Sequence, residues 1–210
     1  LLAKGFVSTP MISLGTVKNK ADLGVIITAS HNPPSYNGFK LKGSYGGPLL
    51  PDHVSEIENI IKDSPSVDIE KLSLDDFEKQ GLLSYVDLET LYIEHVKANF
   101  DLDAIKNSGK RWAYDAMFGS GQNVMKQLFP EITMLHCDHN PGFHGQAPEP
   151  IHKNLKEFSD LIKKEGNIAC GLVTDGDADR IGLYDSKGNF VDSHHIIILL
   201  IHYLYKYKGM

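Results

Sequence analysis

Short apolar runs of strand length alternate along this chain with segments in which apolar residues recur every three or four positions. The two clearest runs are residues 23–29 and 168–173, and each ends at a loop of polar side chains. Runs of this length predict buried strands, whereas the recurring pattern predicts helices. Strands that alternate with helices indicate parallel or mixed sheets covered by helices. The pattern therefore predicts an α/β fold with mixed sheets flanked by helices.

The same reading gives the order of the remaining elements. Strands are predicted over residues 23–29, 38–42, 111–114, 132–137, 168–173, 181–184 and 190–191. Helices are predicted to begin near Pro10, Pro51, Leu88, Asn123, Leu155 and Ser193. Ser193 is the expected N-cap of the last helix, and the apolar run 196–201 is expected to form one buried turn in it. Residues 64–70 are polar and include a proline, which predicts a connection.

A domain boundary is predicted at residues 107–109, where the sequence is Asn-Ser-Gly and a new α/β unit follows. The turn at residues 119–121 joins a predicted strand to a helix. It lacks the Lys-Ser/Thr of a phosphate-binding P-loop, so we expect it to be a structural turn.

Composition narrows the class of protein. The chain has 210 residues, of which 41% are hydrophobic and 23% charged, as in ordinary globular domains. Its net charge of −6 and the lack of a basic tract argue against a nucleic-acid partner. Cys137 and Cys170 are too few for a disulfide framework, which favours a reducing, cytoplasmic location. The longest apolar run is too short to span a bilayer, so no membrane association is expected.

Three carboxylates stand close together after the strand 168–173. Asp175, Asp177 and Asp179 alternate with small residues, and Arg180 follows directly. Like charges at this spacing repel unless a cation lies between them, and a hard divalent cation is the usual one. An EF-hand is excluded, because its twelfth position would be Ser186 instead of Glu. A solvated acidic turn is the simpler alternative.

A serine follows the other clear strand. Ser30 stands at a turn after residues 23–29, and two prolines, at positions 33 and 34, prevent a helix from starting there. A serine hydroxyl becomes a useful nucleophile when a base or a positive charge assists it. His31 and Lys40 are candidates for acid–base work or charge neutralisation, although a lone histidine is more often structural. Magnesium commonly completes its coordination with phosphate oxygens. A magnesium ion bound by the three aspartates could therefore also bind a phosphate group.

Two strings taken together suggest a family. Residues 28–33 (TASHNP) and 175–180 (DGDADR) resemble the phosphoserine loop and the metal-binding loop of the α-D-phosphohexomutases, which include phosphoglucomutases and phosphomannomutases. The resemblance covers essentially the whole chain. Further strings that carry it are residues 37–40, 45–48, 113–121 and 147–150.

The resemblance implies a domain organisation. Residues 1–107 correspond to the later part of the family's domain 1, residues 108–188 to domain 2 and residues 189–210 to the beginning of domain 3. The chain lacks an initiator Met and counterparts of the family's later loops, so we expect a piece of a larger protein. Such a piece is expected to bind metal weakly and to turn over sugar phosphate poorly, because the remaining domains are missing.

The resemblance also implies a reaction. Phosphorylated Ser30 would donate to a hexose phosphate, and the resulting hexose bisphosphate would return the other phosphate to Ser30. Magnesium would be held by Asp175, Asp177, Asp179 and an oxygen of the phosphorylated serine.

Other residues of the two loops would assist this reaction. Arg180 would bind phosphoryl oxygens or the serine loop. Lys40, with His31 as second candidate, would exchange protons with the sugar hydroxyl, and a lysine in this role needs a lowered pKa. Ala178 departs from the family pattern, in which many members have Gly.

Two other functions stay open at this point. One is a magnesium-dependent phosphatase or phosphotransferase with Asp175 or Asp177 as nucleophile. The other is a non-catalytic cation-binding module. Within the family, residues 45–48 favour the phosphoglucomutase/phosphomannomutase type slightly over the glucosamine enzyme, and pentose phosphates are a further alternative.

Overall fold

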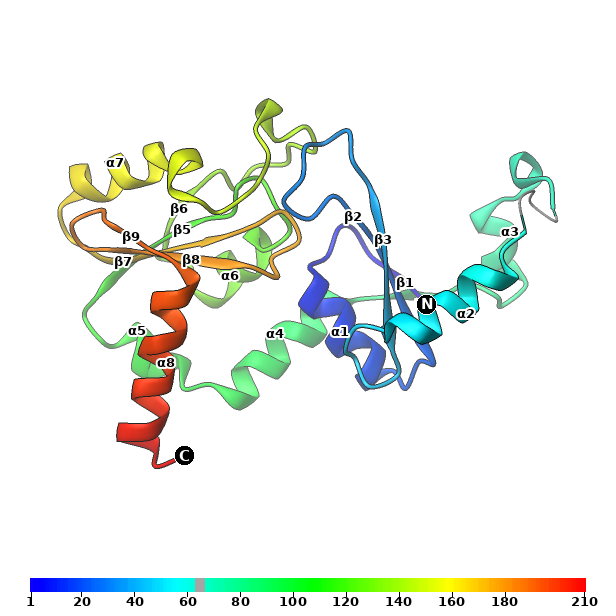
Figure 1. Cartoon of the computed structure of the whole chain (residues 1–210), viewed down its shortest axis with the longest axis horizontal. Helices are drawn as coiled ribbons and strands as arrows, with labels where there is room; N and C mark the ends of the chain where they lie inside the picture. Colours follow the sequence, from blue (N-terminus) through cyan, green and yellow to red (C-terminus); the bar gives the residue numbers. More distant parts are fainter. Residues whose placement is uncertain (63–66) are drawn as a thin grey trace.

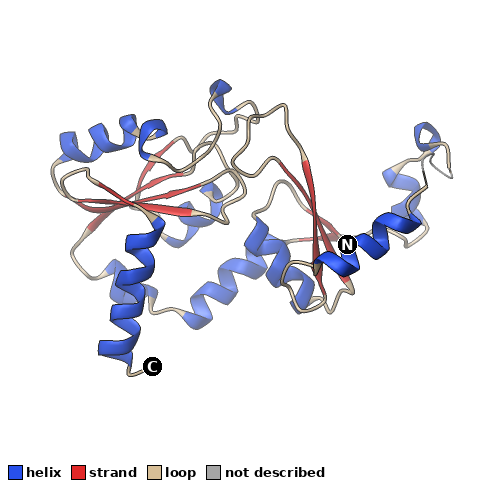
Figure 2. Ribbon diagram, viewed as in Figure 1, coloured by secondary structure: helices blue, strands red, loops and turns tan. Residues whose placement is uncertain are grey.

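The structure is a computed structural model that describes residues 1–62 and 67–210. Helices and strands alternate along the chain, and the described strands form three sheets (Figures 1 and 2). The largest sheet has five strands in the order β6-β5-β7-β8-β9. This arrangement confirms the predicted α/β class with mixed sheets flanked by helices.

The first part of the chain contains a parallel pair, β1 (Leu2–Ala3) with β4 (Tyr85–Val86), and an antiparallel pair, β2 (Leu23–Thr28) with β3 (Gly38–Gly43). Helix α1 (Thr9–Lys18) packs against the second pair. A Cβ added at Gly24 would lie 2.4 Å from the hydroxyl oxygen of Thr16 in α1. The absence of a side chain there lets helix and strand approach closely. Ser8 caps the helix, and its side chain accepts a hydrogen bond from the N–H of Met11.

The next helices lead away from this pair of strands (Figure 1). They are α2 (Pro51–Ile60), a 3-10 turn at Ile69–Lys71 and α3 (Leu74–Lys79). Residues 64–66 of the predicted connection lie outside the described residues, and α3 was not predicted. Helices α4 (Leu88–Asn99) and α5 (Leu102–Lys106) then connect to the five-stranded sheet.

In the five-stranded sheet, the central strand β7 has a parallel neighbour on one side and an antiparallel neighbour on the other. The parallel strands are β5 (Arg111–Asp115), β6 (Thr133–Leu135) and β7 (Ile168–Thr174). The antiparallel strands are β8 (Ile181–Asp185) and β9 (Phe190–Val191), joined by the predicted turn. Helices α6 (Gln122–Leu128) and α7 (Lys156–Glu165) flank the sheet (Figure 2).

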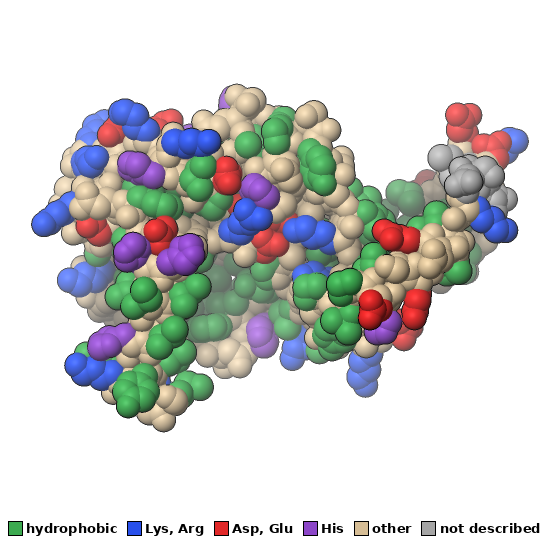
Figure 3. All heavy atoms as spheres, viewed as in Figure 1, with side chains coloured by type: hydrophobic (Ala, Val, Ile, Leu, Met, Phe, Trp, Pro, Cys, Tyr) green, Lys and Arg blue, Asp and Glu red, His purple; other side chains and the backbone are tan. Residues whose placement is uncertain are grey.

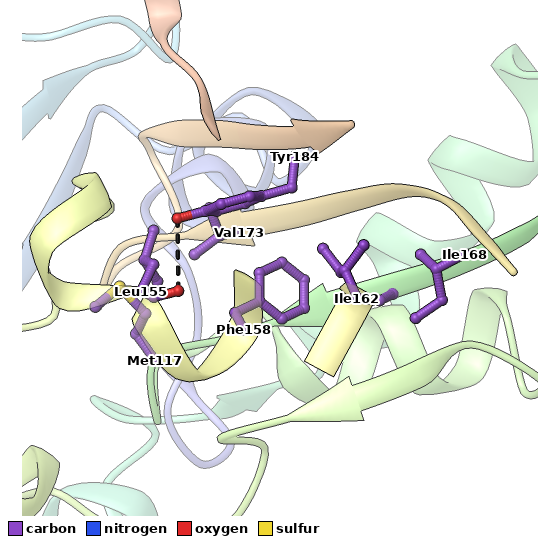
Figure 4. Packing of buried hydrophobic residues seen from close by; sticks show 8 residues of the cluster. Met117, Leu155, Phe158, Ile162, Ile168, Val173 and Tyr184 are labelled. Atoms are coloured by element: carbon purple, nitrogen blue, oxygen red, sulfur yellow. Dashed lines mark hydrogen bonds between the residues drawn. The ribbon is translucent and has the colours of Figure 1, made fainter. Parts of the chain in front are cut away.

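Helix α7 covers one face of this sheet (Figure 4). Phe158 of α7 meets Tyr184 of β8 edge to face, with ring centroids 5.6 Å apart, and the Tyr184 hydroxyl donates to the carbonyl of Leu155 at 3.5 Å. Such aromatic pairs add to the stabilisation that burial supplies. The buried members of this cluster are Ala113, Met117, Leu155, Phe158, Ile162, Ile168, Val173 and Tyr184.

A second buried cluster joins the two parts of the molecule. It takes side chains from α1, α4, α5 and α6, namely Met11, Leu88, Ile93, Leu102, Val124 and Leu128. Because α1 and α6 share this core, α1 is held beside the loops that follow β5 and β7. The cluster crosses residue 107, and the domain boundary there stays a prediction.

Helix α8 (Ser193–Lys208) corrects two expectations. Its N-cap is Asp192, not Ser193, because the Asp192 carboxylate accepts hydrogen bonds from the N–H groups of His194 and His195, each at 3.0 Å. The run 196–201 was expected to be buried, yet only Ile196 is buried and residues 197–201 are exposed. The helix projects from the sheet, and its apolar side chains lie on the surface (Figures 1 and 3).

No helix in the described part of the chain has the length and apolar character needed to cross a bilayer.

Candidate metal and phosphoryl site

The serine loop after β2 and the aspartate loop after β7, residues 175–180, meet in space. The hydroxyl of Ser30 donates a hydrogen bond to Asp175 Oδ2 at 3.3 Å, across 145 positions of sequence. The backbones are close as well, since a Cβ added at Gly176 would lie 2.5 Å from the carbonyl oxygen of Ser30. Ser30 itself has a left-handed backbone, with φ of 53°, and its N–H donates to the hydroxyl of Thr28 at 2.8 Å. The structure thus brings together the two loops that the sequence singled out.

Asp175 holds the aspartate loop in shape. Its side chain is fully buried, and Oδ1 accepts hydrogen bonds from the backbone N–H groups of Asp179 at 3.0 Å and Arg180 at 3.1 Å. Burial raises the pKa of Asp175 to about 7, and the charges of the two neighbouring aspartates act in the same direction. Asp175 therefore serves both the loop's backbone and the serine hydroxyl.

Asp177 is bound from two different elements. Its Oδ2 accepts hydrogen bonds from the Thr9 hydroxyl at 2.8 Å and from Lys40 Nζ at 2.9 Å. Burial acts to raise the pKa of Asp177, but the hydrogen bonds from Lys40 and Thr9 outweigh it and hold that pKa below its usual value. Its Oδ1 is buried and has no hydrogen-bond partner among the residues that the structure describes. One oxygen of this carboxylate is therefore free to bind a ligand.

Lys40 bridges two carboxylates, because its Nζ also lies 3.2 Å from Asp179 Oδ2. We expected a proton-exchanging lysine to have a lowered pKa. Burial does act to lower the pKa of Lys40, but the hydrogen bonds and charges of Asp177 and Asp179 raise it above its ordinary value. The expectation is wrong for this arrangement, because two carboxylates beside an ammonium favour its charged form.

The aspartate loop fits a hard cation. Each of Asp175, Asp177 and Asp179 offers an oxygen, and these oxygens lie within 4.8 Å of one another. Carboxylate oxygens suit magnesium, and the unpartnered Asp177 Oδ1 is the kind of atom that a cation satisfies. Asp175 and Asp177 are 0% and 4% exposed, so the loop is not the solvated acidic turn considered as an alternative.

A pocket of about 550 Å³ opens beside this cluster. Its lining includes three cationic side chains, Lys40, Lys42 and Arg180, together with the predicted nucleophile Ser30. His31 is not among the lining residues, and its Nδ1 is buried without a hydrogen-bond partner in the described ranges. Of the four predicted catalytic residues, the fold gathers three around one pocket and leaves His31 outside it.

Two residues of this site were not found from the sequence. Thr9 was assigned only to the start of a helix, and no local pattern marks it as a partner of an aspartate 168 positions away. Lys42 was not singled out, although it follows Lys40 by two positions in a predicted strand. Alternate residues of a strand share a face, and this signal would have placed the two lysines side by side.

The turn at residues 119–121 packs against the backbone of the aspartate loop. The N–H of Ser120 donates to the carbonyl of Gly176 at 3.0 Å. A Cβ at Gly119 would lie 2.7 Å from the same carbonyl oxygen and 2.8 Å from that of Asp175. These contacts support the structural role predicted for the turn.

Comparison with protein families gives two matches. Residues 1–68 match the model for phosphoglucomutase/phosphomannomutase alpha/beta/alpha domain I, and residues 90–188 match the model for domain II. The first match contains the serine loop and the second contains the aspartate loop. Together the two models account for most of the chain.

The curated relatives are named after different sugar phosphates. A phosphomannomutase of Methanocaldococcus jannaschii is 33% identical over 210 residues, and the match covers 98% of this chain and 44% of the relative. A phosphoglucosamine mutase of Methanococcus maripaludis is 33% identical over 220 residues, with coverages of 98% and 45%. A phosphoglucomutase of Neisseria meningitidis is 34% identical over 196 residues, with coverages of 91% and 40%. The chain thus spans less than half the length of these relatives.

Solved structures agree with this assignment. A crystal structure from Thermus thermophilus, described as a candidate phosphomannomutase, matches with a TM-score of 0.85 and 31% identity. The match covers 99% of this chain and 46% of the other. With both loops in place, and with each loop inside a matched family model, the chain belongs to the phosphoglucomutase/phosphomannomutase family, of which it carries domains I and II.

Proposed function

We propose that the protein containing this chain is an intramolecular phosphotransferase that interconverts hexose 1-phosphate and hexose 6-phosphate through a phosphoserine at Ser30. The observation that carries the proposal is the contact between the Ser30 hydroxyl and Asp175, at 3.3 Å, in a cluster of oxygens suited to a cation. A phosphoryl group on Ser30 would then lie beside that cation. The names of the relatives support the reaction class and leave glucose, mannose and glucosamine phosphates as substrates.

The proposed reaction has two balanced halves. First, the bond between phosphorus and Ser30 Oγ breaks, a bond from phosphorus to the free sugar hydroxyl forms, and the hydroxyl proton passes through a base to Ser30 Oγ. The bisphosphorylated sugar then turns over, and the reverse step returns its other phosphoryl group to Ser30. Lys40 is the proposed proton-exchange residue, because it lines the same pocket as Ser30. His31, which lies outside that lining, is the weaker candidate.

Magnesium is the proposed cofactor, held by Asp175, Asp177, Asp179 and an oxygen of phosphorylated Ser30. When bound, it would offset negative charge on the transferring group. The guanidinium of Arg180 lines the pocket and is suited to bind two phosphoryl oxygens at once. Lys40 would have to release its carboxylate partners before it could act as a base.

The decisive experiment replaces the serine in the full-length protein. Ser30→Ala is expected to abolish mutase activity on glucose 1-phosphate and on mannose 1-phosphate, whereas Ser55→Ala, which removes an exposed hydroxyl of α2 outside the pocket lining, should leave activity unchanged. Mass spectrometry of the wild type should locate phosphate on Ser30. Full activity in Ser30→Ala, or phosphate on Asp175 or Asp177, would instead support an enzyme with an aspartyl nucleophile. Preference for calcium, with neither phosphorylation nor activity, would support a cation-binding module.

A further inference from the structure

Lys42 is a largely buried lysine that the reaction proposed above does not use. The residue is 8% exposed, and it lines the same pocket as Ser30 and Arg180. It faces Gly24 in the register of β2 and β3, where Ile26 faces Lys40, so both lysines lie on the strand face toward α1. The two lysines are therefore adjacent cations on one wall of the pocket.

The two lysines differ in their partners. Lys40 Nζ contacts Asp177 at 2.9 Å and Asp179 at 3.2 Å. By contrast, Lys42 makes no salt bridge and no side-chain hydrogen bond with any residue in the described part of the chain. The stem of Lys42 is buried, but its Nζ is not among the buried unpartnered atoms of the described residues, so the ammonium reaches the water of the pocket. An ammonium without a protein counter-charge at the wall of a pocket is available to an anion from outside.

The rest of the pocket suits an anion with several oxygens. Ser13 of α1 adds a hydroxyl group to the lining, and Arg180 adds a guanidinium group. Among the described residues that line the pocket, Asp179 alone is acidic, and its Oδ2 already contacts Lys40. Lys42 and Arg180 thus leave an excess of positive charge, which matches the dianion of a phosphate monoester.

We propose that Lys42, together with Arg180 and the hydroxyl of Ser13, binds a phosphoryl dianion in the pocket beside Ser30. The inference deepens the proposed function and rests on it for the chemical identity of the anion. Two sources supply that chemistry, namely the phosphoryl group carried by Ser30 and the phosphate of a sugar phosphate. Lys42 is then a phosphate-binding residue, distinct from the proton-exchange role proposed for Lys40.

The first arm of the test uses free phosphate. The full 210-residue chain with Ser30→Ala cannot form phosphoserine, so titration with inorganic phosphate in a calorimeter measures the pocket alone. In this background Lys42→Met is expected to weaken binding about tenfold, since charged hydrogen bonds contribute more than neutral ones. Lys42→Arg should keep most of the affinity. Lys18→Met, which removes an exposed lysine at the end of α1, is the matched control and should change nothing.

The second arm uses the phosphorylated chain. A cation near phosphoserine lowers the second pKa of its phosphate, which phosphorus NMR follows during a pH titration. If Lys42 contacts that phosphate, Lys42→Met should raise this pKa, and Lys42→Arg should restore it. If only the affinity for inorganic phosphate depends on Lys42, the ligand is the phosphate of a free sugar phosphate. If only the phosphoserine pKa depends on Lys42, the ligand is the phosphoryl group on Ser30.

The outcomes separate this inference from the proposed function. The inference would be overturned if Lys42→Met changed neither the phosphate affinity of the Ser30→Ala chain nor the phosphoserine pKa of the phosphorylated chain, even if Ser30→Ala abolishes mutase activity. Failure of the Ser30→Ala chain to bind inorganic phosphate, together with a phosphoserine pKa that does not depend on Lys42, would also overturn it. Phosphate binding that depends on Lys42, in a full-length protein without mutase activity, would instead overturn only the proposed function. Circular dichroism checks the folding of each variant, and Lys42→Gln replaces Lys42→Met if the latter does not fold.

Discussion

The hydroxyl of Thr9, in the first turn of α1, donates a hydrogen bond to the carboxylate of Asp177 at 2.8 Å. The backbone N–H of Thr9 also donates to the backbone carbonyl of Asp177, at 2.9 Å. One residue of the helix thus fixes both the main chain and the side chain of one residue in the aspartate loop. This pairing links the part of the molecule that carries Ser30 to the part that carries the candidate metal ligands.

Thr9→Val should therefore weaken magnesium binding. Valine keeps the shape of threonine but lacks the hydroxyl, so the Asp177 side chain loses the donor that orients it. Loss of such an outer hydrogen bond commonly costs about tenfold or more in metal affinity. Calorimetric titration with magnesium measures the change. Thr9→Ser keeps the hydroxyl and should bind like the wild type, and equal affinity in Thr9→Val would contradict the role given to this bond.

Gly119→Ala should destabilise the protein by displacing the aspartate loop. The added Cβ would meet three carbonyl oxygens between 2.7 and 2.9 Å away, and backbone atoms yield poorly. We expect the free energy of unfolding to fall by about 2–3 kcal/mol, as in other overpacked sites. Chemical denaturation measures it.

The control for this substitution is Gly81→Ala. A Cβ there meets nothing within 4 Å, although the φ of +71° is unfavourable for alanine. Its cost should be the backbone strain alone, roughly 1 kcal/mol. A cost in Gly119→Ala no larger than in Gly81→Ala would show that the turn does not support the loop.

His136 should make stability depend on pH. The hydrogen bond from its Nδ1 to Asp115, at 3.0 Å, raises the pKa of His136, although partial burial opposes this, and Glu157 adds in the same direction. A group whose folded pKa is raised contributes its full stabilisation below the unfolded pKa, about 6.5 for histidine. That contribution is lost as the pH rises through the folded pKa.

The variant His136→Asn removes the titrating group. Asparagine is chosen because His136 has a φ of 49°, a conformation that asparagine tolerates. The stability difference between wild type and variant should be largest near about pH 6 and should shrink toward about pH 8 and above. Thermal unfolding over this range measures it, and a difference that does not change with pH would refute the pairing with Asp115.

Ala178→Gly should stabilise the aspartate loop. Ala178 has a φ of 53°, in the left-handed region that is strained for alanine. Relief of that strain should exceed the entropy that glycine adds to the unfolded chain, so we expect a net gain of up to about 1 kcal/mol. Ala98→Gly, inside helix α4, is the matched control and should cost about 1 kcal/mol. Denaturation that shows a loss in Ala178→Gly would contradict this account.

The strands and loops that carry the site were predictable because their signals are local. The runs before Ser30 and Asp175 are apolar and end in residues that break regular structure, and both strands were found. The N-cap of α8 was predicted wrongly, because two adjacent residues can both cap a helix. Asp192 is the N-cap in place of the expected Ser193. It also failed for the run 196–201, because apolar character in a helix does not say whether another surface covers it.

The sequence by itself determined which groups are available, namely a serine at one strand end and three alternating carboxylates with an arginine at another. These are properties of residue type and spacing. The tertiary structure alone decided what each group contacts. It places Thr9 on Asp177, lets two carboxylates raise the pKa of Lys40, leaves His31 outside the pocket and buries Lys42 in its wall. These contacts depend on how α1, β3 and the aspartate loop pack together, and interactions between residues more than a hundred positions apart leave no local pattern in the chain.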